Sequence, residues 1–206
     1  MKEIEFYTLD NGKIPVQIWL ESLDTINRAR VYARFARIQN GNLGDYKKIN
    51  NEIAELRFNF SKGYRIYFAE INNVIILLLN AGDKKTQSSD IKKHILISKI
   101  GGKNKMTKYK NSTSLQTIME QYLKSPEDIK EYLNGALELY IEEGDFNAFY
   151  NSLEYVIKAQ GNLSEFARKT GISRANLYNI FQSKKEPKIQ TVAKILKELG
   201  FSLKVA

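Results

Sequence analysis

The residues best suited to chemistry in this chain are two arginines and a tyrosine within residues 55–68. Apolar and polar side chains alternate on both sides of Ser61-Lys62-Gly63, which is the period of half-buried strands. A hairpin built this way places Arg57, Arg65 and Tyr67 on one face of a sheet. Cations clustered beside a tyrosine suit phosphate oxygens, so the pattern predicts a surface that binds nucleic acid.

The loop length of this hairpin can be predicted from the side chains. A two-residue loop would set Phe58 opposite Arg65 and mix the apolar and basic sets, whereas a three-residue loop ending at Gly63 keeps them apart. The predicted pairs are Phe58 with Ile66, Arg57 with Tyr67 and Asn59 with Arg65. The face toward the core would then carry Leu56, Phe58, Phe60, Tyr64, Ile66 and Phe68.

More lysines flank this hairpin along the chain. Residues 73–80 are almost wholly aliphatic and predict a central buried strand, which would deliver Lys84 and Lys85 to the same region. Lys47 and Lys48 precede the hairpin and could position a phosphate backbone. A short helix is expected from Ser89 onward.

The preceding residues predict the elements that support the hairpin. A first strand over 4–9, a turn at Asn11-Gly12, a helix opened by Pro15 and a second helix from Thr25 come before the antiparallel strands. This order predicts a compact α+β domain, with two helices on a small antiparallel sheet. The second helix carries Arg28, Arg30, Arg34 and Arg37, mostly on its outer side. Those arginines form either a solvated face or a surface that steers phosphates.

Composition limits the possible functions. Residues 1–105 hold 18 Lys and Arg against 11 Asp and Glu, a net charge of +7, so a polyanion is the expected partner of this half. The chain has no Cys and one His, which leaves little for a metal centre, and no cofactor is expected. No membrane-spanning run or signal-peptide pattern is present, so we expect a cytoplasmic protein without a membrane partner.

The chain changes character near residue 101. A Gly- and Lys-rich stretch predicts a linker or join over 101–114, and Met106-Thr107-Lys108 looks like the start of a separate protein. From Leu115 the pattern is helical, with Ser125-Pro126 as a helix start, a further helix from Gly144-Asp145, a closing helix over 187–199 and a short strand over 201–205. The predicted domains are therefore 1–100 and 115–206.

Residues 162–181 predict a helix-turn-helix. Asn162 caps the first helix, Gly171 takes the tight turn, and Ser173 caps the second helix. Arg suits guanine and Asn suits adenine in the major groove, while lysines suit the phosphate backbone. The candidate DNA-binding residues are Ser173, Arg174, Asn176, Tyr178, Asn179, Lys184 and Lys185. The alternative is a helix pair used only for packing.

The first half resembles the phage-derived addiction-module killer branch of the RelE/HigB toxin superfamily. The resemblance rests on Ile18–Leu23, Gly41–Asp45, Glu55–Arg57, Gly63–Phe68 and Gly82–Gln87 with Asp90-Ile91. It implies a RelE-like fold and a metal-independent endoribonuclease (an mRNA interferase) that cleaves mRNA on the ribosome.

In such an enzyme the 2′-hydroxyl attacks the adjacent phosphate, leaving a cyclic phosphate and a free 5′-hydroxyl. The resemblance implies that Arg57 and Arg65 hold the phosphate, that Tyr67 stacks or relays a proton, and that Lys84 stabilises charge. The general base is not assigned. Histidine has a suitable unperturbed pKa near 6.5, but His94 lies in an apolar run where a partly buried structural role competes.

The second half resembles HigA-like antitoxins through residues 125–137, the helix-turn-helix and Leu196–Gly200. This implies a type II toxin–antitoxin module in one chain, in which the second half contacts and neutralises the first, binds operator DNA as a homodimer and represses transcription. The alternative is a transcriptional repressor whose toxin-like half is catalytically inactive. A general RNA-binding protein without cleavage is a third possibility.

Overall fold

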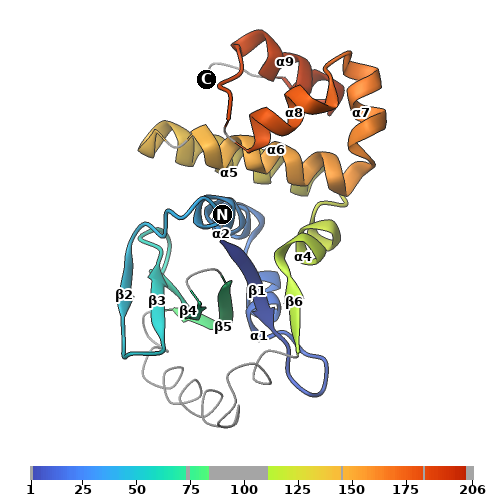
Figure 1. The fold of residues 1–206 in the computed structure, drawn as a ribbon. Helices are drawn as coiled ribbons and strands as arrows, with labels where there is room; N and C mark the ends of the chain where they lie inside the picture. Colours follow the sequence, from blue (N-terminus) through green and yellow to red (C-terminus); the bar gives the residue numbers. More distant parts are fainter. Residues whose placement is uncertain (1, 73–74, 84–110, 145, 183, 203–206) are drawn as a thin grey trace.

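The computed structural model describes residues 2–72, 75–83, 111–144, 146–182 and 184–202 (Figure 1). Its elements form successive layers, with a mixed sheet at one end, helices α1 and α2 against one face of that sheet, then α5 and α6, and finally α7 to α9. The described chain therefore has an N-terminal sheet with helices and a C-terminal helical region, as expected.

The sheet has the strand order β2-β3-β4-β5-β1-β6. Its strands are β1 (Glu3–Tyr7), β2 (Tyr46–Lys48), β3 (Ala54–Arg57), β4 (Tyr64–Ile71), β5 (Ile75–Asp83) and β6 (Ser112–Ser114). β5 is central, as predicted, but it pairs in parallel with β1, so the expected antiparallel sheet is in fact mixed. The intervening helices supply the long crossover that a parallel pair requires.

The hairpin of β3 and β4 has the predicted faces but not the predicted register. Arg57 lies opposite Arg65, and Leu56 lies opposite Ile66, so the pairing is shifted by two residues. A shift of two preserves the inward and outward sides of a strand, which explains why the core face is correct. The turn ends at Gly63 in the left-handed conformation, with φ of 71°, as expected. The Phe58 amide donates to the Tyr64 carbonyl across it, so the loop spans residues 59–63 and the predicted three-residue loop is wrong.

Helices α1 (Pro15–Glu21) and α2 (Thr25–Gln39) cover the core face of the sheet. Asp24 caps α2 by accepting a hydrogen bond from the Asn27 amide at 2.9 Å. Residues 31–38 of α2 are all buried, which contradicts the expectation of a solvated arginine face. The helix is enclosed because α5 and α6 pack on the side away from the sheet.

The second half consists of six helices among the described residues. They are α4 (Leu115–Tyr122), α5 (Pro126–Glu143), α6 (Phe146–Gln160), α7 (Leu163–Thr170), α8 (Arg174–Phe181) and α9 (Ile189–Glu198). The predicted caps Ser125, Asn162 and Ser173 each accept a backbone hydrogen bond at the start of their helix. The expected helix from Ser89 and most of the expected strand over 201–205 lie outside the described residues.

The end of the predicted linker belongs to the sheet. Ser112–Ser114 forms β6 and pairs antiparallel with β1, so regular structure in the second half begins before Leu115, within the predicted linker. One continuous hydrophobic cluster then runs from the sheet through α2 into α4, α5 and α6, and it includes Phe6, Phe35, Ile118 and Tyr132. The two halves therefore share a core.

Candidate nucleic-acid interfaces

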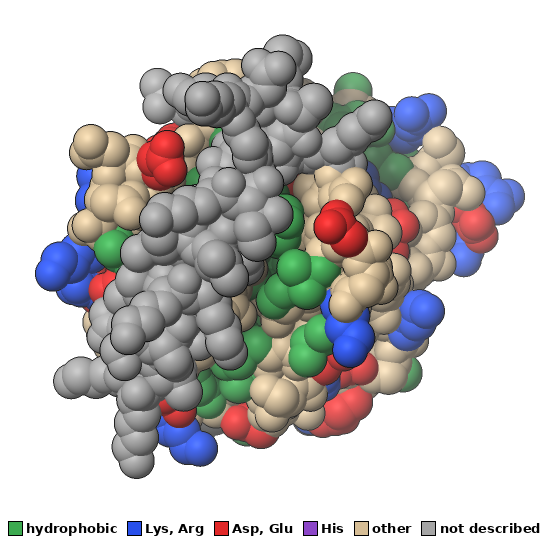
Figure 2. Space-filling model, turned by 90° about the horizontal axis from the view of Figure 1, so that it is seen from below, with side chains coloured by type: hydrophobic (Ala, Val, Ile, Leu, Met, Phe, Trp, Pro, Cys, Tyr) green, Lys and Arg blue, Asp and Glu red, His purple; other side chains and the backbone are tan. Residues whose placement is uncertain are grey.

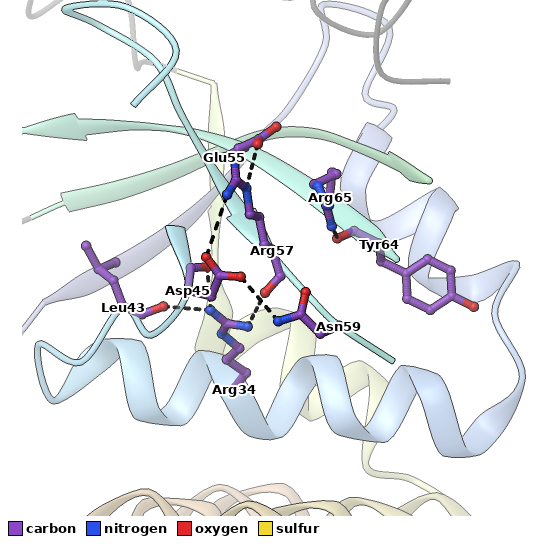
Figure 3. A network of polar contacts seen from close by, with 8 residues as sticks. All are labelled: Arg34, Leu43, Asp45, Glu55, Arg57, Asn59, Tyr64 and Arg65. Atoms are coloured by element: carbon purple, nitrogen blue, oxygen red, sulfur yellow. Dashed lines mark hydrogen bonds and ion pairs between the residues drawn. The ribbon is translucent and has the colours of Figure 1, made fainter. Parts of the chain in front are cut away.

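The face of the sheet opposite α2 brings the two predicted phosphate-binding arginines together. Arg57 and Arg65 are paired residues on β3 and β4, and both are half-buried. Figure 3 shows Arg57 extending from the side of β3 away from α2. Nη1 of Arg65 donates to the Tyr64 carbonyl at 2.8 Å, and its buried Nε has no acceptor among the described residues. Within the described part of the chain, the Nε of Arg65 is therefore available to an acceptor.

Two carboxylates balance the charge of Arg57. Its Nε donates to Oε1 of Glu55 at 2.8 Å, and its Nη1 lies 4.0 Å from Oδ1 of Asp45. Only 2% of the Glu55 side chain is exposed, so this ion pair is largely protected from water. Glu55 lies on the same strand as Arg57, whereas Asp45 comes from the loop before β2. Arg57 is therefore held in place, and a phosphate would have to compete with Glu55 for it.

Arg34 supports this site from beneath the sheet. Its guanidinium donates to the carbonyls of Leu43 at 2.9 Å and Asp45 at 2.8 Å, and also to the carbonyl of Arg57 (Figure 3). It lies over the Phe58 ring at 4.6 Å. Burial, with a smaller effect from the charge of Arg37, lowers the pKa of Arg34 to about 10. Arg34 therefore remains charged at neutral pH.

Gly44 makes room for this buried guanidinium. A Cβ at this position would lie 2.9 Å from Nη2 of Arg34, and the backbone has φ of +62°. Both facts favour glycine. Sequence reasoning placed Arg34 on an outer surface, as part of either a solvated face or a surface that steers phosphates, and not beneath the sheet. The Gly-rich segment before Asp45 was the available signal that a backbone approaches something closely here.

Tyr67 is fully buried rather than displayed for stacking. It lies opposite Glu55 and belongs to a small cluster on this face with Ile53, Leu77 and Leu79. A β-bulge follows it, where the register between β4 and β5 shifts. In this arrangement the ring of Tyr67 packs the sheet face beside the arginines.

Of the lysines predicted to bind RNA, two lie in the described part of the chain. Lys47 and Lys48 lie on β2, an edge strand in which every residue is exposed. Lys84, Lys85 and His94 lie outside the described residues. Figure 2 shows that cationic side chains on the described part of the lower face are interspersed with acidic ones. On this face, the described cations are therefore dispersed rather than gathered in one broad basic patch.

The second half contacts the first through α2. Arg28 pairs with Asp128 at 3.3 Å, and Arg30 pairs with Glu138 at 2.7 Å. Between these ion pairs, Gly135 brings α5 so close that an added Cβ would meet the backbone of residues 29–30 at 3.3 Å. The glycine therefore permits a backbone-to-backbone approach of α2 and α5, which sequence periodicity did not reveal.

The other end of this interface is polar. Nδ2 of Asn151 donates to Oδ1 of Asn40 at 3.0 Å, and the Tyr155 hydroxyl donates to Oε1 of Gln39 at 2.7 Å. Burial raises the pKa of Tyr155, so it is a neutral donor across the physiological range. These directional contacts fix how α6 lies on the end of α2.

The predicted helix-turn-helix segment consists of α7 and α8 joined at Gly171, whose φ is 62°. Leu177 and Ile180 are buried, whereas Arg174, Tyr178 and Asn179 are exposed. Asn176 is half-buried, and its amide donates to the capping Ser173 hydroxyl at 3.2 Å. Lys184 and Lys185 are exposed, and their amides donate to the Asn179 carbonyl. Most of the predicted DNA-binding side chains thus share one end of the molecule.

Two other kinds of site receive no support from the described residues. Within these ranges, no group of three or more His, Asp or Glu side chains is arranged to hold a metal ion. None of the described helices is long and apolar enough to cross a membrane.

Comparison with known families matches the two halves separately. Residues 18–99 match the family described as phage-derived protein Gp49-like (DUF891), and residues 113–206 match the family described as probable addiction module antidote protein. The structure therefore combines a toxin-family domain and an antidote-family domain, the two components of a toxin–antitoxin module.

Individual relatives are half the size of this chain. An uncharacterized protein of Haemophilus influenzae is 43% identical over 81 residues, which cover 39% of this chain and 82% of the relative. A second uncharacterized protein of the same organism is 33% identical over 85 residues, covering 41% and 82%. No solved structure matches. The chain belongs to the Gp49-like family through its first half and to the addiction-module antidote family through its second.

Proposed function

We propose that the first half is a RelE/HigB-like endoribonuclease that cleaves mRNA on the ribosome, and that the HigA-like second half keeps it inactive. The observation that supports this function best is the Arg57 and Arg65 pair on the sheet face opposite α2. Two guanidinium groups on adjacent strands can contact the non-bridging oxygens of one phosphodiester. They would stabilise the charge that develops when the 2′-hydroxyl attacks phosphorus and the 5′-oxygen leaves.

The supporting residues have defined parts in this proposal. We call Arg57 and Arg65 the clamp. Arg34 holds the Arg57 carbonyl and the loop that carries Asp45, so it positions the clamp without touching RNA. Lys47, Lys48 and Lys85 would contact neighbouring phosphates, and Lys84 would stabilise charge at the reacting one. Because Tyr67 is buried, we assign it a packing role in the resting chain rather than a stacking role.

In this proposal, the antidote half inhibits the toxin half through the place where it docks. Helices α5 and α6 lie against α2, on the opposite side of the sheet from Arg57 (Figures 1 and 3). An antidote placed there would obstruct entry into a confined site such as the ribosomal A site without touching the clamp. The second half would also bind operator DNA as a homodimer, using the α7 and α8 pair as a helix-turn-helix with α8 in the major groove.

The experiment that tests this function uses the full chain with its docking surface disrupted. Gly135→Leu drives a side chain into the α2 backbone and should separate the halves, whereas Gly161→Leu enters open space and serves as the matched control. Growth arrest with mRNA cleavage is expected from the first variant only. Adding Arg65→Ala to Gly135→Leu should abolish the arrest. Arrest that persists with Arg65→Ala would remove this site from the mechanism.

One observation favours a second function, that of a repressor with an inactive toxin-like half. Arg57 is already paired with the buried Glu55, so the clamp could be purely structural. Absence of cleavage in Gly135→Leu, together with operator binding lost in Arg174→Ala, would establish this alternative.

A further inference from the structure

The edge of β1 is occupied by a strand from the antidote side of the chain. The toxin-family match ends at residue 99 and the antidote-family match begins at residue 113, yet Ser112–Ser114 completes the toxin-family sheet as β6. Without β6, β1 would be an edge strand with a row of unpaired backbone groups. Without β6, this edge would be a template for an added strand.

The contacts between the two strands combine backbone and side-chain recognition. The Thr8 amide donates to the Asn111 carbonyl at 2.9 Å, and the hydroxyls of Thr8 and Thr113 lie 3.1 Å apart. Nδ2 of Asn111 also donates to Oδ1 of Asp10 at 3.3 Å. The backbone bonds supply general affinity, whereas the side-chain contacts favour one register.

The strand leads directly into a helix that is buried in the shared core. The Ser114 hydroxyl caps α4 by accepting from the Thr117 amide at 3.2 Å, and Leu115, Ile118 and Met119 are buried. Tyr122, at the end of α4, stacks on Tyr32 of α2 with ring centroids 4.4 Å apart. The segment therefore docks both through its backbone and through an apolar helix face.

The relatives show that a covalent join is not general in this family. A protein matched over 81 residues that make up 82% of its length has about 100 residues, which is the size of one half. In a two-chain module, contacts alone must hold the halves together.

We propose that residues 111–114 are a strand-addition element by which the antidote half recognises the edge of β1, so that the halves stay bound when the chain between them is cut. The inference rests on the division into toxin and antidote halves given above. The kind of partner that fits this edge is an extended Ser- and Thr-rich segment followed by an apolar helix.

Backbone geometry supplies a matched pair of variants. Thr8 and Asn111 are a hydrogen-bonded pair, and such pairs alternate along an antiparallel ladder, so Phe6 and Thr113 form the next one. Thr113→Pro removes an amide that faces β1. Ser112→Pro removes an amide that faces away from β1, a position where an edge strand tolerates proline.

The test places a protease site between Lys103 and Asn104 of the full chain and cuts the purified protein. The unmodified halves should co-elute in gel filtration. Thr113→Pro should raise their dissociation constant at least about tenfold, and Ser112→Pro by less than about threefold. Separation of the unmodified halves after cutting, or equal effects of the two prolines, would overturn the proposal.

A second measurement does not depend on any variant. Hydrogen exchange of the Thr8 amide should remain slow in the cut, unmodified complex, because its acceptor on Asn111 stays in place. Fast exchange there, with other β1 amides protected, would contradict strand addition. Neither readout involves RNA or DNA, so a failure of the proposed nuclease activity would leave this result unaffected.

Discussion

The two arginine-bearing surfaces of the toxin-family half are partnered in opposite ways. On α2, Arg28 and Arg30 are neutralised by Asp128 and Glu138 of the antidote-family half. On the sheet, Arg57 is balanced within its own half by Glu55, and Arg65 contacts the neighbouring carbonyl. The comparison shows that the antidote is complementary to the helix surface rather than to the clamp. In the proposed function, docking and chemistry would therefore use different arginines.

The largest effect should come from removing one member of the clamp. In the Gly135→Leu background, Arg65→Ala should lower the rate of mRNA cleavage by about 10²- to 10³-fold, since it deletes one charge-stabilising group. Arg28→Ala in the same background should change it little. Single-turnover cleavage of a translated message measures both variants. Equal losses in the two would remove the distinction between the surfaces.

Arg34 lies on α2 and donates to the carbonyl of Arg57 on the sheet, so it connects the two surfaces. Its replacement should cause the largest change in stability. Arg34→Met retains much of the side-chain bulk but leaves the carbonyls of Leu43 and Asp45 without their donor. We expect the free energy of unfolding to fall by about 3 kcal/mol, measured by urea denaturation. Arg30→Met, at a more exposed position on the same helix, is the control and should cost less. A smaller loss for Arg34→Met than for Arg30→Met would mean that the hydrogen bonds from Arg34 to these carbonyls contribute little to stability.

A smaller effect is expected from the ion pair of Arg30 and Glu138. Both side chains are partly exposed, so a double-mutant cycle with Arg30→Gln and Glu138→Gln should give a coupling of about 0.5 kcal/mol. Raising the salt concentration should reduce that coupling, because screening weakens exposed pairs. A salt-independent coupling would show that the antidote recognises shape rather than charge on α2.

Local features of this fold could be predicted from the sequence. The caps Ser125, Asn162 and Ser173 each accept a hydrogen bond from the backbone amide three residues later. Their role can therefore be predicted from the neighbouring sequence alone. The faces of the hairpin were also correct, because the observed register differs from the predicted one by two residues, and a shift of two keeps each side chain on its side. The register itself was wrong because Phe58 pairs with Tyr64, so the loop is longer than the three residues predicted.

Features that depend on residues far away in the sequence could not be predicted. The burial of Arg34 depends on a loop backbone, which supplies the carbonyls of Leu43 and Asp45. Ser112–Ser114 is polar and short, so its local sequence resembles a linker until β1 offers it a partner. At the site, Arg57 and Arg65 were brought together as expected, whereas the burial of Tyr67 depends on Ile53, Leu77 and Leu79.

In the proposed function, Gly135 would affect the lifetime of the antidote as well as its fit. A glycine in the middle of α5 lowers the intrinsic helicity of that segment by about 1 kcal/mol relative to alanine. In a separated antidote, α5 would therefore open more often and expose its backbone to proteases. Against α2, close packing compensates for this weakness. The residue that permits close packing against α2 would thus also make the undocked helix easier to degrade, so in the proposed function one position would couple inhibition to turnover.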